Sequence, residues 1–251
     1  MRKLIELIGV WFKYLKFRYF GKEIVVKNSF LGERLFACKN NVEYYRVNNY
    51  GDEEMALGAF MFLLREDDIV WDIGASVGLF SIYSAPLVSK VISFEPDREI
   101  YERLLKNIAL NRFEDKINAL QIGLSTEAGL VSLSSDGLNG NSPSISNLGR
   151  HQGQIMVEVN SIDNLIKSGL HWPSVLKIDI EGAEILALKG AQDLLKSNAA
   201  PRLIFIEIHP DFLIYFESHE SEVLDLITSN NYLIVCNNIR ENQRHVIAIK
   251  N

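Results

Sequence analysis

The strongest chemical signal in the sequence is a glycine turn that follows an apolar run (69–73) and opens a helical pattern. The turn reads DIGASVG over residues 72–78. Its glycines, Gly74 and Gly78, allow a tight turn and a close approach of the backbone to a ligand. The first N–H groups of the following helix have no partner within the helix and can also bind that ligand. The turn therefore indicates a binding site, although two glycines at this spacing also fit a purely structural turn.

A second signal is an acid, Glu95, which ends the next apolar run 23 residues after Asp72. A carboxylate at that place can accept hydrogen bonds from both hydroxyls of a ribose. Taken alone, Glu95 fits a helix entry, where the helix dipole favours an acid, and Asp72 fits an ordinary strand end. Two acids around one glycine turn favour an adenosyl-binding site.

The spacing distinguishes between two cofactors that contain adenosine, the dinucleotide NAD and S-adenosylmethionine. The dinucleotide fingerprint G-x-G-x-x-G places a pyrophosphate on a helix N-terminus, but here the middle glycine is absent. Asp72 stands two residues before the first glycine and would repel a pyrophosphate. S-adenosylmethionine carries a sulfonium and an ammonium and no phosphate, so the same acid becomes favourable. We therefore predict S-adenosylmethionine as the cofactor. The predicted contacts are Asp72, Gly74, Ala75, Ser76, Gly78, Glu95, Pro96 and Asp179.

A third signal lies in the segment LKIDIEGAE (176–184). Alternate side chains of a strand share a face, so Lys177, Asp179 and Glu181 are expected together at the carboxyl end. Open α/β sheets bind their ligands at that end. An acid in a strand this apolar is uncommon as solvated surface, which supports a site role for Asp179. Lys177 fits a structural ion pair as well as a catalytic role, and Glu184 fits support of a helix N-terminus.

A fourth signal is the pair Glu207 and His209, which share a face of another strand-like run, FIEIHP (205–210). An alcohol is a poor nucleophile until a base takes its proton. We predict His209 as that base, with Glu207 or Asp179 orienting its ring, and Asp179 as the alternative base. The competing interpretation is a structural pair of Glu207 and His209.

Carboxylates at this density also raise the question of a metal, because magnesium prefers oxygen ligands. We nevertheless expect activity without a metal and assign no metal ligand. The two cysteines lie far apart, and no Cys/His cluster has metal-ligand spacing. The four side chains that could form a magnesium site are Asp179, Glu181, Glu207 and His209.

The elements that must position these residues alternate between apolar strand patterns and amphipathic helix patterns from residue 66 onward. This alternation predicts a parallel sheet covered on both faces, a Rossmann-like α/β fold. The last two strands, joined by the polar segment 237–244, are expected to form an antiparallel hairpin. The predicted strands are 69–73, 91–95, 117–122, 175–180, 203–208, 232–236 and 245–249, and the predicted helices are 79–85, 98–110, 183–195 (with a break near Gly190) and 222–229.

Two segments lie outside this alternation. Residues 134–153, rich in Ser, Gly and Asn, are predicted as a mobile loop between the strands 130–133 and 155–159. Long loops in compact domains are often lids, and a plain surface excursion is the alternative. Residues 1–50 are predicted as an N-terminal extension and 51–251 as the main domain, with short strands and turns over 24–50 and a helix over 52–64 that leads into the main domain.

Residues 1–22 read as a basic amphipathic helix with a local charge of +5. We interpret its apolar stripe as docking on the chain's own domain. The alternative is peripheral contact with an anionic membrane surface or another partner. The overall charge of −6 argues against a protein that grips nucleic acid. With no disulfide framework and no apolar run long enough to span a bilayer, we expect a cytoplasmic protein, membrane-associated only if residues 1–22 contact lipid.

Together the motifs resemble the FkbM-type methyltransferases. The resemblance rests on DIGASVG (72–78), SFEPD (93–97), NIALN (107–111), VNSIDNL (159–165), LKIDIEGAEILALKGAQDLL (176–195) and FIEIHP (205–210). It departs from the family at Ser76, where Asn is typical; serine can still donate a hydrogen bond.

The resemblance implies a class I methyltransferase fold with a seven-stranded sheet. It also implies methyl transfer to a hydroxyl oxygen of a saccharide, a lipid-linked glycan or a natural product. The alternative is a non-catalytic adenosyl-binding module or a membrane-associated interaction module. The acids Asp72, Glu95 and Asp179 favour the enzyme. The sequence does not identify the acceptor or the oligomeric state.

Overall fold

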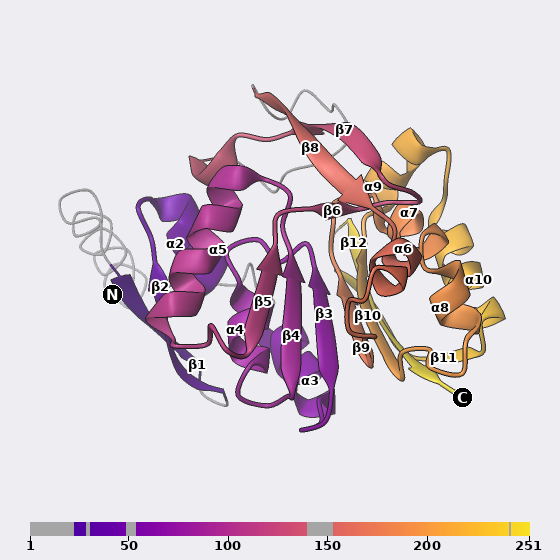
Figure 1. Cartoon of the computed structure of the whole chain (residues 1–251), viewed down its shortest axis with the longest axis horizontal. Coiled ribbons are helices and arrows are strands. Elements are labelled where there is room, and N and C mark those ends of the chain that lie inside the picture. The colour runs from indigo at the N-terminus through magenta and orange to yellow at the C-terminus, as the bar shows by residue number, and fades with distance from the viewer. Residues whose placement is uncertain (1–22, 29–30, 49–53, 140–152, 241) are drawn as a thin grey trace, which may run out of the picture.

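A computed structural model gives the fold of the chain (Figure 1). The residues that it describes are 23–28, 31–48, 54–139, 153–240 and 242–251.

A seven-stranded sheet forms the centre of the molecule, in the order β11-β12-β10-β9-β3-β4-β5. The five strands from β10 to β5 are parallel, and β12 runs antiparallel to both of its neighbours. This confirms the predicted Rossmann-like α/β fold of a class I methyltransferase, with a mostly parallel sheet and an antiparallel hairpin at its C-terminus. The strands are β3 (Ile69–Ile73), β4 (Lys90–Phe94), β5 (Ile117–Leu120), β9 (Val175–Ile178), β10 (Leu203–Ile208), β11 (Tyr232–Arg240) and β12 (Gln243–Lys250).

The C-terminal hairpin is longer than its hydrophobic pattern indicates. The segment 237–244 was expected to be a connector, but β11 continues to Arg240 and β12 already begins at Gln243. Asn237 pairs with Val246 across the hairpin. An edge strand of an antiparallel sheet can face water on one side, so polar residues remain within it.

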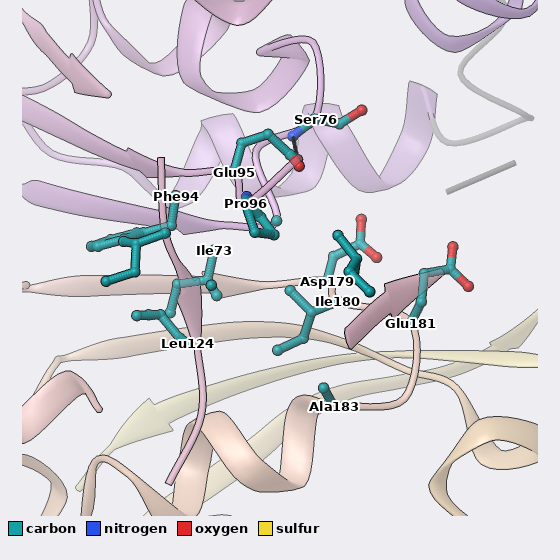
Figure 2. Close-up of a pocket in the computed structure, with 14 residues that line it drawn as sticks. Ile73, Ser76, Phe94, Glu95, Pro96, Leu124, Asp179, Ile180, Glu181 and Ala183 are labelled. Carbon is teal, nitrogen blue, oxygen red and sulfur yellow. Dashed lines mark hydrogen bonds between the residues drawn. The ribbon is translucent and has the colours of Figure 1, made fainter. Parts of the chain in front are cut away.

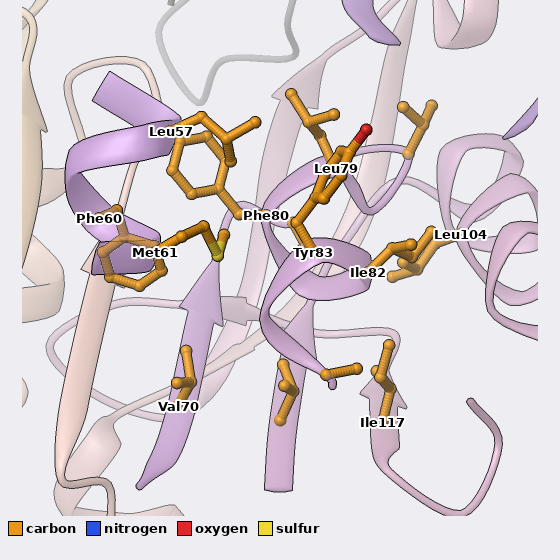
Figure 3. Packing of buried hydrophobic residues seen from close by; sticks show 14 of the residues in the cluster. Leu57, Phe60, Met61, Val70, Leu79, Phe80, Ile82, Tyr83, Leu104 and Ile117 are labelled. Atoms are coloured by element: carbon orange, nitrogen blue, oxygen red, sulfur yellow. The ribbon is translucent and has the colours of Figure 1, made fainter. Parts of the chain in front are cut away.

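Helices cover both faces of the sheet, and each face has its own hydrophobic core. Successive strand residues point to opposite faces: Val70 belongs to one core and Trp71 to the other. Figure 3 shows Phe60, Phe80 and other residues of the first core packed around the strands. Helices α3 (Glu54–Leu63), α4 (Leu79–Ser84) and α5 (Arg98–Leu110) contribute to this core, and α6 (Ile162–Lys167), α7 (Glu184–Lys189), α8 (Gln192–Lys196) and α10 (Glu220–Ser229) contribute to the second.

Local sequence explains where these helices begin and end. The side chain of Asp97 caps α5 by accepting hydrogen bonds from the N–H groups of Glu99 and Ile100 at 2.8 and 3.1 Å. The predicted break at Gly190 is confirmed, because α7 ends before it and α8 begins after it. Short helical turns complete the set at η2 (Gly137–Asn139), α9 (Pro210–Leu213) and η3 (Ile214–Phe216).

The described part of the N-terminal extension packs against α5. Strands β1 (Glu23–Asn28) and β2 (Gly32–Ala37) form an antiparallel pair. The prediction of strands and turns over residues 24–50 was wrong for α2 (Asn41–Asn48), which is helical. Buried Val26, Phe36 and Val47 belong to the same core as the first face of the sheet. Residues 1–22, with their predicted basic helix, lie outside the described residues.

A second, smaller sheet lies beside the carboxyl ends of the strands (Figure 1). Strands β7 (Gly129–Ser134) and β8 (Gln154–Asn160), which match the strands predicted at 130–133 and 155–159, form an antiparallel hairpin, and β6 (Gly123–Leu124) pairs with β8 in parallel. Most of the predicted loop, residues 140–152, lies outside the described residues.

Candidate active site

A pocket lies at the carboxyl ends of β3, β4 and β9, the place where open α/β sheets bind ligands (Figure 2). Its walls come from the two turns after β3 and β4, from the segment that enters β6, and from the turn after β9. The lining residues are Ile73, Gly74, Ser76, Phe94, Glu95, Pro96, Ile122, Gly123, Leu124, Leu133, Asp179, Ile180, Glu181 and Ala183.

The glycine turn after β3 requires its first glycine. Gly74 has φ +79°, a conformation that side chains disfavour. A Cβ at this position would lie 1.9 Å from the carbonyl oxygen of Asp179. The turn after β3 and the turn after β9 are therefore in direct contact, and any side chain at Gly74 would push them apart. The other residues of the turn with predicted roles, Ala75 and Gly78, do not line the pocket.

Glu95 places a buried carboxylate at the pocket wall. Its side chain accepts hydrogen bonds from the backbone N–H groups of Ser76 and Asp97 at 3.0 and 2.9 Å. Burial raises the pKa of Glu95 to about 7, with the neighbouring charge of Asp97 acting in the same direction. Each carboxylate oxygen retains a second lone pair, so Glu95 can still accept hydrogen bonds from a ligand.

Asp72, a predicted cofactor contact, lies beneath the turn and does not line the pocket. It is fully buried, and its two oxygens contact the hydroxyl of Ser81 at 2.5 Å and the ammonium of Lys177 at 3.2 Å. Lys177 also donates to the carbonyl oxygen of Gly74 at 3.1 Å. Lys177 thus forms the structural ion pair that was one of its two interpretations, and this pair supports the glycine turn from below.

Three of the residues predicted for catalysis come together where β9 and β10 end. The Nε2 atom of His209 lies 3.5 Å from an oxygen of Glu207 and 4.0 Å from an oxygen of Asp179. A carboxylate oxygen of Glu181 lies 3.8 Å from the same nitrogen. The second oxygen of Glu207 lies 3.0 Å from Nε2 of His245. We call Asp179, Glu207 and His209 the strand-end cluster.

The opposite nitrogen of His209 has a partner that sequence reasoning missed. Nδ1 lies 2.8 Å from Oε1 of Glu184, which is fully buried and also accepts from the N–H of Gly182 at 2.9 Å. Glu184 was interpreted only as support for a helix N-terminus. The contact arises because the turn after β9 has positive φ at Glu181 and Gly182, and no spacing rule reveals that turn.

The electrostatics of the strand-end cluster favour positive charge on its histidine. Burial lowers the pKa of His209, but the hydrogen bond and charge of Glu184, together with Glu207 and Glu181, outweigh it and hold this pKa well above its ordinary value. Burial raises the pKa of Asp179 against the opposing effect of Lys177. Burial also acts to raise the pKa of Glu207, yet its contacts with His209 and His245 hold this pKa below its ordinary value.

The members of the cluster differ in how exposed their side chains are, and this decides which of them a ligand can reach. The side chain of Asp179 is 29% exposed and lines the pocket, as does the side chain of Glu181. The side chain of His209 is only 2% exposed, and neither His209 nor Glu207 lines the pocket. A molecule in the pocket therefore meets Asp179 first, with the imidazole behind it.

The pocket fits an adenosyl cofactor. Glu95 places a carboxylate at its wall, a group of the kind that ribose hydroxyls bind, and the glycine at position 74 keeps the approach to the backbone free of side-chain atoms. Ile122 and Leu124 supply apolar walls that suit a flat base. S-adenosylmethionine brings an electrophilic methyl group on a positive sulfur, for which a site with exposed carboxylates such as Asp179 is favourable.

Comparison with known proteins finds other methyltransferases that are similar to this chain. One relative is the hexuronic acid methyltransferase AglP of Haloferax volcanii, 28% identical over 179 residues that cover 69% of this chain and 70% of the relative. Another is the methyltransferase sdnD of Sordaria araneosa, 30% identical over 52% of this chain and 62% of the relative. Among solved structures, methyltransferase FkbM from Methylobacillus flagellatus KT aligns with 75% of this chain and 45% of its own, with TM-score 0.49 and 20% identity.

None of the described helices has the length and hydrophobicity that a membrane span requires.

The family model of the methyltransferase FkbM domain matches residues 72–234, which contain the glycine turn, Glu95 and the whole strand-end cluster. The chain therefore belongs to the FkbM methyltransferase family and is a methyltransferase that uses S-adenosylmethionine.

Proposed function

We propose that the chain transfers the methyl group of S-adenosylmethionine to a hydroxyl oxygen of a saccharide. The observation that carries this proposal is the strand-end cluster, which puts proton-accepting groups beside the cofactor pocket. The relative from Haloferax volcanii, named a hexuronic acid methyltransferase, supports a sugar as the acceptor.

A hydroxyl acceptor explains why proton-accepting groups stand at this place. Methyl transfer from a sulfonium is an in-line displacement, so the acceptor oxygen must be aligned with the methyl group and must lose its proton as the bond forms. The proton leaves toward the strand-end cluster, whose exposed member is Asp179. His209 was the base predicted from the sequence, and its burial makes Asp179 the group that contacts the acceptor.

The remaining contacts position the cofactor. Glu95 binds the ribose, and the backbone of Gly74 and Ser76 forms the wall beside it. The pair of Asp72 and Lys177 holds that wall in place from below without contacting the ligand. This division separates residues whose loss weakens cofactor binding from residues whose loss slows methyl transfer.

The test is a transfer assay with radiolabelled S-adenosylmethionine and three kinds of acceptor: saccharides that contain a uronic acid, neutral saccharides, and phenolic small molecules. We expect S-adenosylhomocysteine and labelled saccharide. The label should resist mild alkali, because a methyl ether is stable and a methyl ester is not. Label lost in alkali would move the acceptor from a hydroxyl to a carboxyl group. Binding of S-adenosylmethionine without turnover on any acceptor would favour the adenosyl-binding module.

A further inference from the structure

We propose that the strand-end cluster binds a divalent metal ion through Nε2 of His209 and carboxylate oxygens of Glu207 and Asp179. The candidate ligand atoms of these three residues lie within 4.8 Å of one another. The proposal stands on this geometry and not on the identity of the methyl acceptor. It departs from the expectation, based on sequence, that no metal is needed.

The first argument is an unpartnered nitrogen aimed at the carboxylates. His209 is 2% exposed, and its Nε2 has no hydrogen-bond partner among the described residues. Because Nδ1 donates to Glu184, Nε2 carries either a second proton or, in the neutral ring, a lone pair that can bind a metal ion. A lone pair that faces carboxylates of Asp179 and Glu207 is repelled unless a positive charge lies between them.

The distances indicate whether this positive charge is a proton on Nε2 or a metal ion. A proton on Nε2 would form N–H···O bonds, which are about 2.7–3.2 Å long. The observed separations, 3.5 Å to Glu207 and 4.0 Å to Asp179, are longer. Two ligands about 2.1 Å from a shared ion lie about 3.0 Å apart at right angles and about 4.2 Å apart across the ion. The cluster therefore has the spacing of metal ligands, with a contraction of a few tenths of an ångström at its widest separation.

The surroundings of the cluster are those of a metal site. A histidine that binds a metal usually donates its other N–H to a carboxylate, the role that Glu184 has here. Glu207 is held from its far side by His245. The ammonium of Lys177 lies 3.4 Å from Asp179 but is shared with Asp72, so it neutralises the carboxylate of Asp179 only in part.

The ligand types select the class of ion. Carboxylates alone would suit Mg²⁺ or Ca²⁺, whereas an imidazole nitrogen favours a first-row transition ion. One nitrogen with two carboxylates fits Mn²⁺ or a similar divalent ion. Because Asp179 lines the pocket, the ion would keep coordination positions open toward it. If the proposed saccharide hydroxyl binds there, the ion would lower the pKa of that hydroxyl, and Asp179 would then act by holding the ion.

The test measures binding of Mn²⁺ to the full chain with no S-adenosylmethionine and no acceptor present. The protein is treated with EDTA, desalted and titrated with MnCl₂, and the paramagnetic resonance signal of free Mn²⁺ reports binding. We expect one ion per chain, and binding at least about tenfold weaker in His209→Gln and Asp179→Asn. His171→Gln, which alters an exposed histidine outside the cluster, is the matched control and should bind as the wild type does.

A thermal unfolding series with MnCl₂ gives a second measurement. The midpoint should rise with Mn²⁺ in the wild type and in His171→Gln but not in Asp179→Asn, because only a folded site binds the ion. If His209→Gln does not fold, Asp179→Asn decides the outcome, since its side chain is partly exposed. Equal Mn²⁺ binding by the wild type and the folded cluster variants would overturn the proposal, as would no binding by any protein. Neither result depends on methyl transfer, so the proposed function is tested separately.

Discussion

The Nδ1 atom of His209 lies 2.8 Å from Oε1 of Glu184, and this contact fixes which nitrogen of the ring faces the pocket side. Glu184 is itself held by the N–H of Gly182 in the turn after β9. The orientation of the imidazole that directly follows β10 is thus set by a turn that also lines the pocket. The pocket and the strand-end cluster therefore share this one turn.

Replacing Glu184 should slow catalysis without weakening cofactor binding. Glu184→Gln keeps the size of the side chain but removes the charge that orients His209, so we expect turnover to fall about 10–100-fold. The affinity for S-adenosylmethionine, measured by calorimetry, should not change, because Glu184 does not line the pocket. Glu222→Gln, at an exposed ion pair with Lys189, is the control. Equal turnover in the two variants would show that Glu184 has no positioning role.

Glu95 should make the stability of the cofactor-free protein depend on pH. Its pKa is raised to about 7 in the folded state, so between its ordinary value and pH 7 the unfolded chain releases a proton that the folded chain retains. The free energy of unfolding therefore falls as pH rises through this window and is constant above it. From pH 5.5 to 7.0 the loss is about 2 kcal/mol.

Urea unfolding of the wild type and Glu95→Gln at pH 5.5 and 7.5 measures this loss. The difference between the two proteins isolates Glu95 from other groups that titrate in the same range. The variant should also bind S-adenosylmethionine more weakly, since it loses the proposed charge-assisted contact to the ribose. A difference in stability that stays constant with pH would contradict the raised pKa of Glu95.

Gly74 should tolerate no side chain. Gly74→Ala would place a methyl group 1.9 Å from the carbonyl oxygen of Asp179, on a residue whose φ is +79°. We expect loss of cofactor affinity and a destabilisation of at least about 2 kcal/mol. Gly58→Ala is the matched control, because it lies in helix α3 with no atom within 4 Å of the added methyl and should gain up to about 1 kcal/mol. Thermal unfolding and calorimetry compare them, and equal behaviour would refute the close contact.

The sheet could be predicted because each of its strands carries its own signal. Strand β3 and helix α5 begin and end at the predicted residues, since an apolar run buried on both faces and a helix capped by Asp97 are both local patterns. Helix α2 was missed because its sequence, NVEYYRVN, is polar and weakly periodic. Its position depends on burial of Val47 and on the ion pair between Glu43 and Arg103, a residue of α5 far along the chain.

The site was less predictable because its contacts depend on register and on turns. Asp72 and Lys177 are paired residues in adjacent parallel strands, so the charge that makes Asp72 attractive for a cofactor is already neutralised in the fold. The sequence around Asp72 or Lys177 does not reveal this ion pair, because the order of the strands in the sheet brings the two residues together. The apolar wall at Ile122 and Leu124 was missed for a related reason, since it belongs to the short segment that leads into and forms β6 of the second sheet.

Asn107 should couple the N-terminal extension to the cofactor turn. Its side chain accepts from the N–H of Ala37 in β2 and donates to the carbonyl oxygen of Val77 in the turn, both at 2.8 Å. Asn107→Ala would leave both backbone groups without this partner in a buried place, so we expect a loss of about 2–4 kcal/mol in urea unfolding. Asn118→Ala, at an exposed position of β5, should lose less than about 0.5 kcal/mol. Equal losses would argue against the coupling.

Two truncations should separate the parts of the N-terminal extension. Removing residues 1–22 should leave affinity for S-adenosylmethionine unchanged, because the cofactor motifs begin at Asp72. Removing residues 1–40 also deletes β1 and β2, takes buried Phe36 from the core, and removes the carbonyl oxygen of Ala37 to which Arg103 donates.

The longer truncation should therefore unfold at lower urea concentration than Asn107→Ala, or fail to fold. Circular dichroism and calorimetry of both truncations measure the result. If the shorter truncation folds but loses cofactor affinity, residues 1–22 contribute to the site. If the longer truncation is as stable as the wild type, the extension is an independent unit and its packing on α5 adds nothing to the stability of the methyltransferase domain.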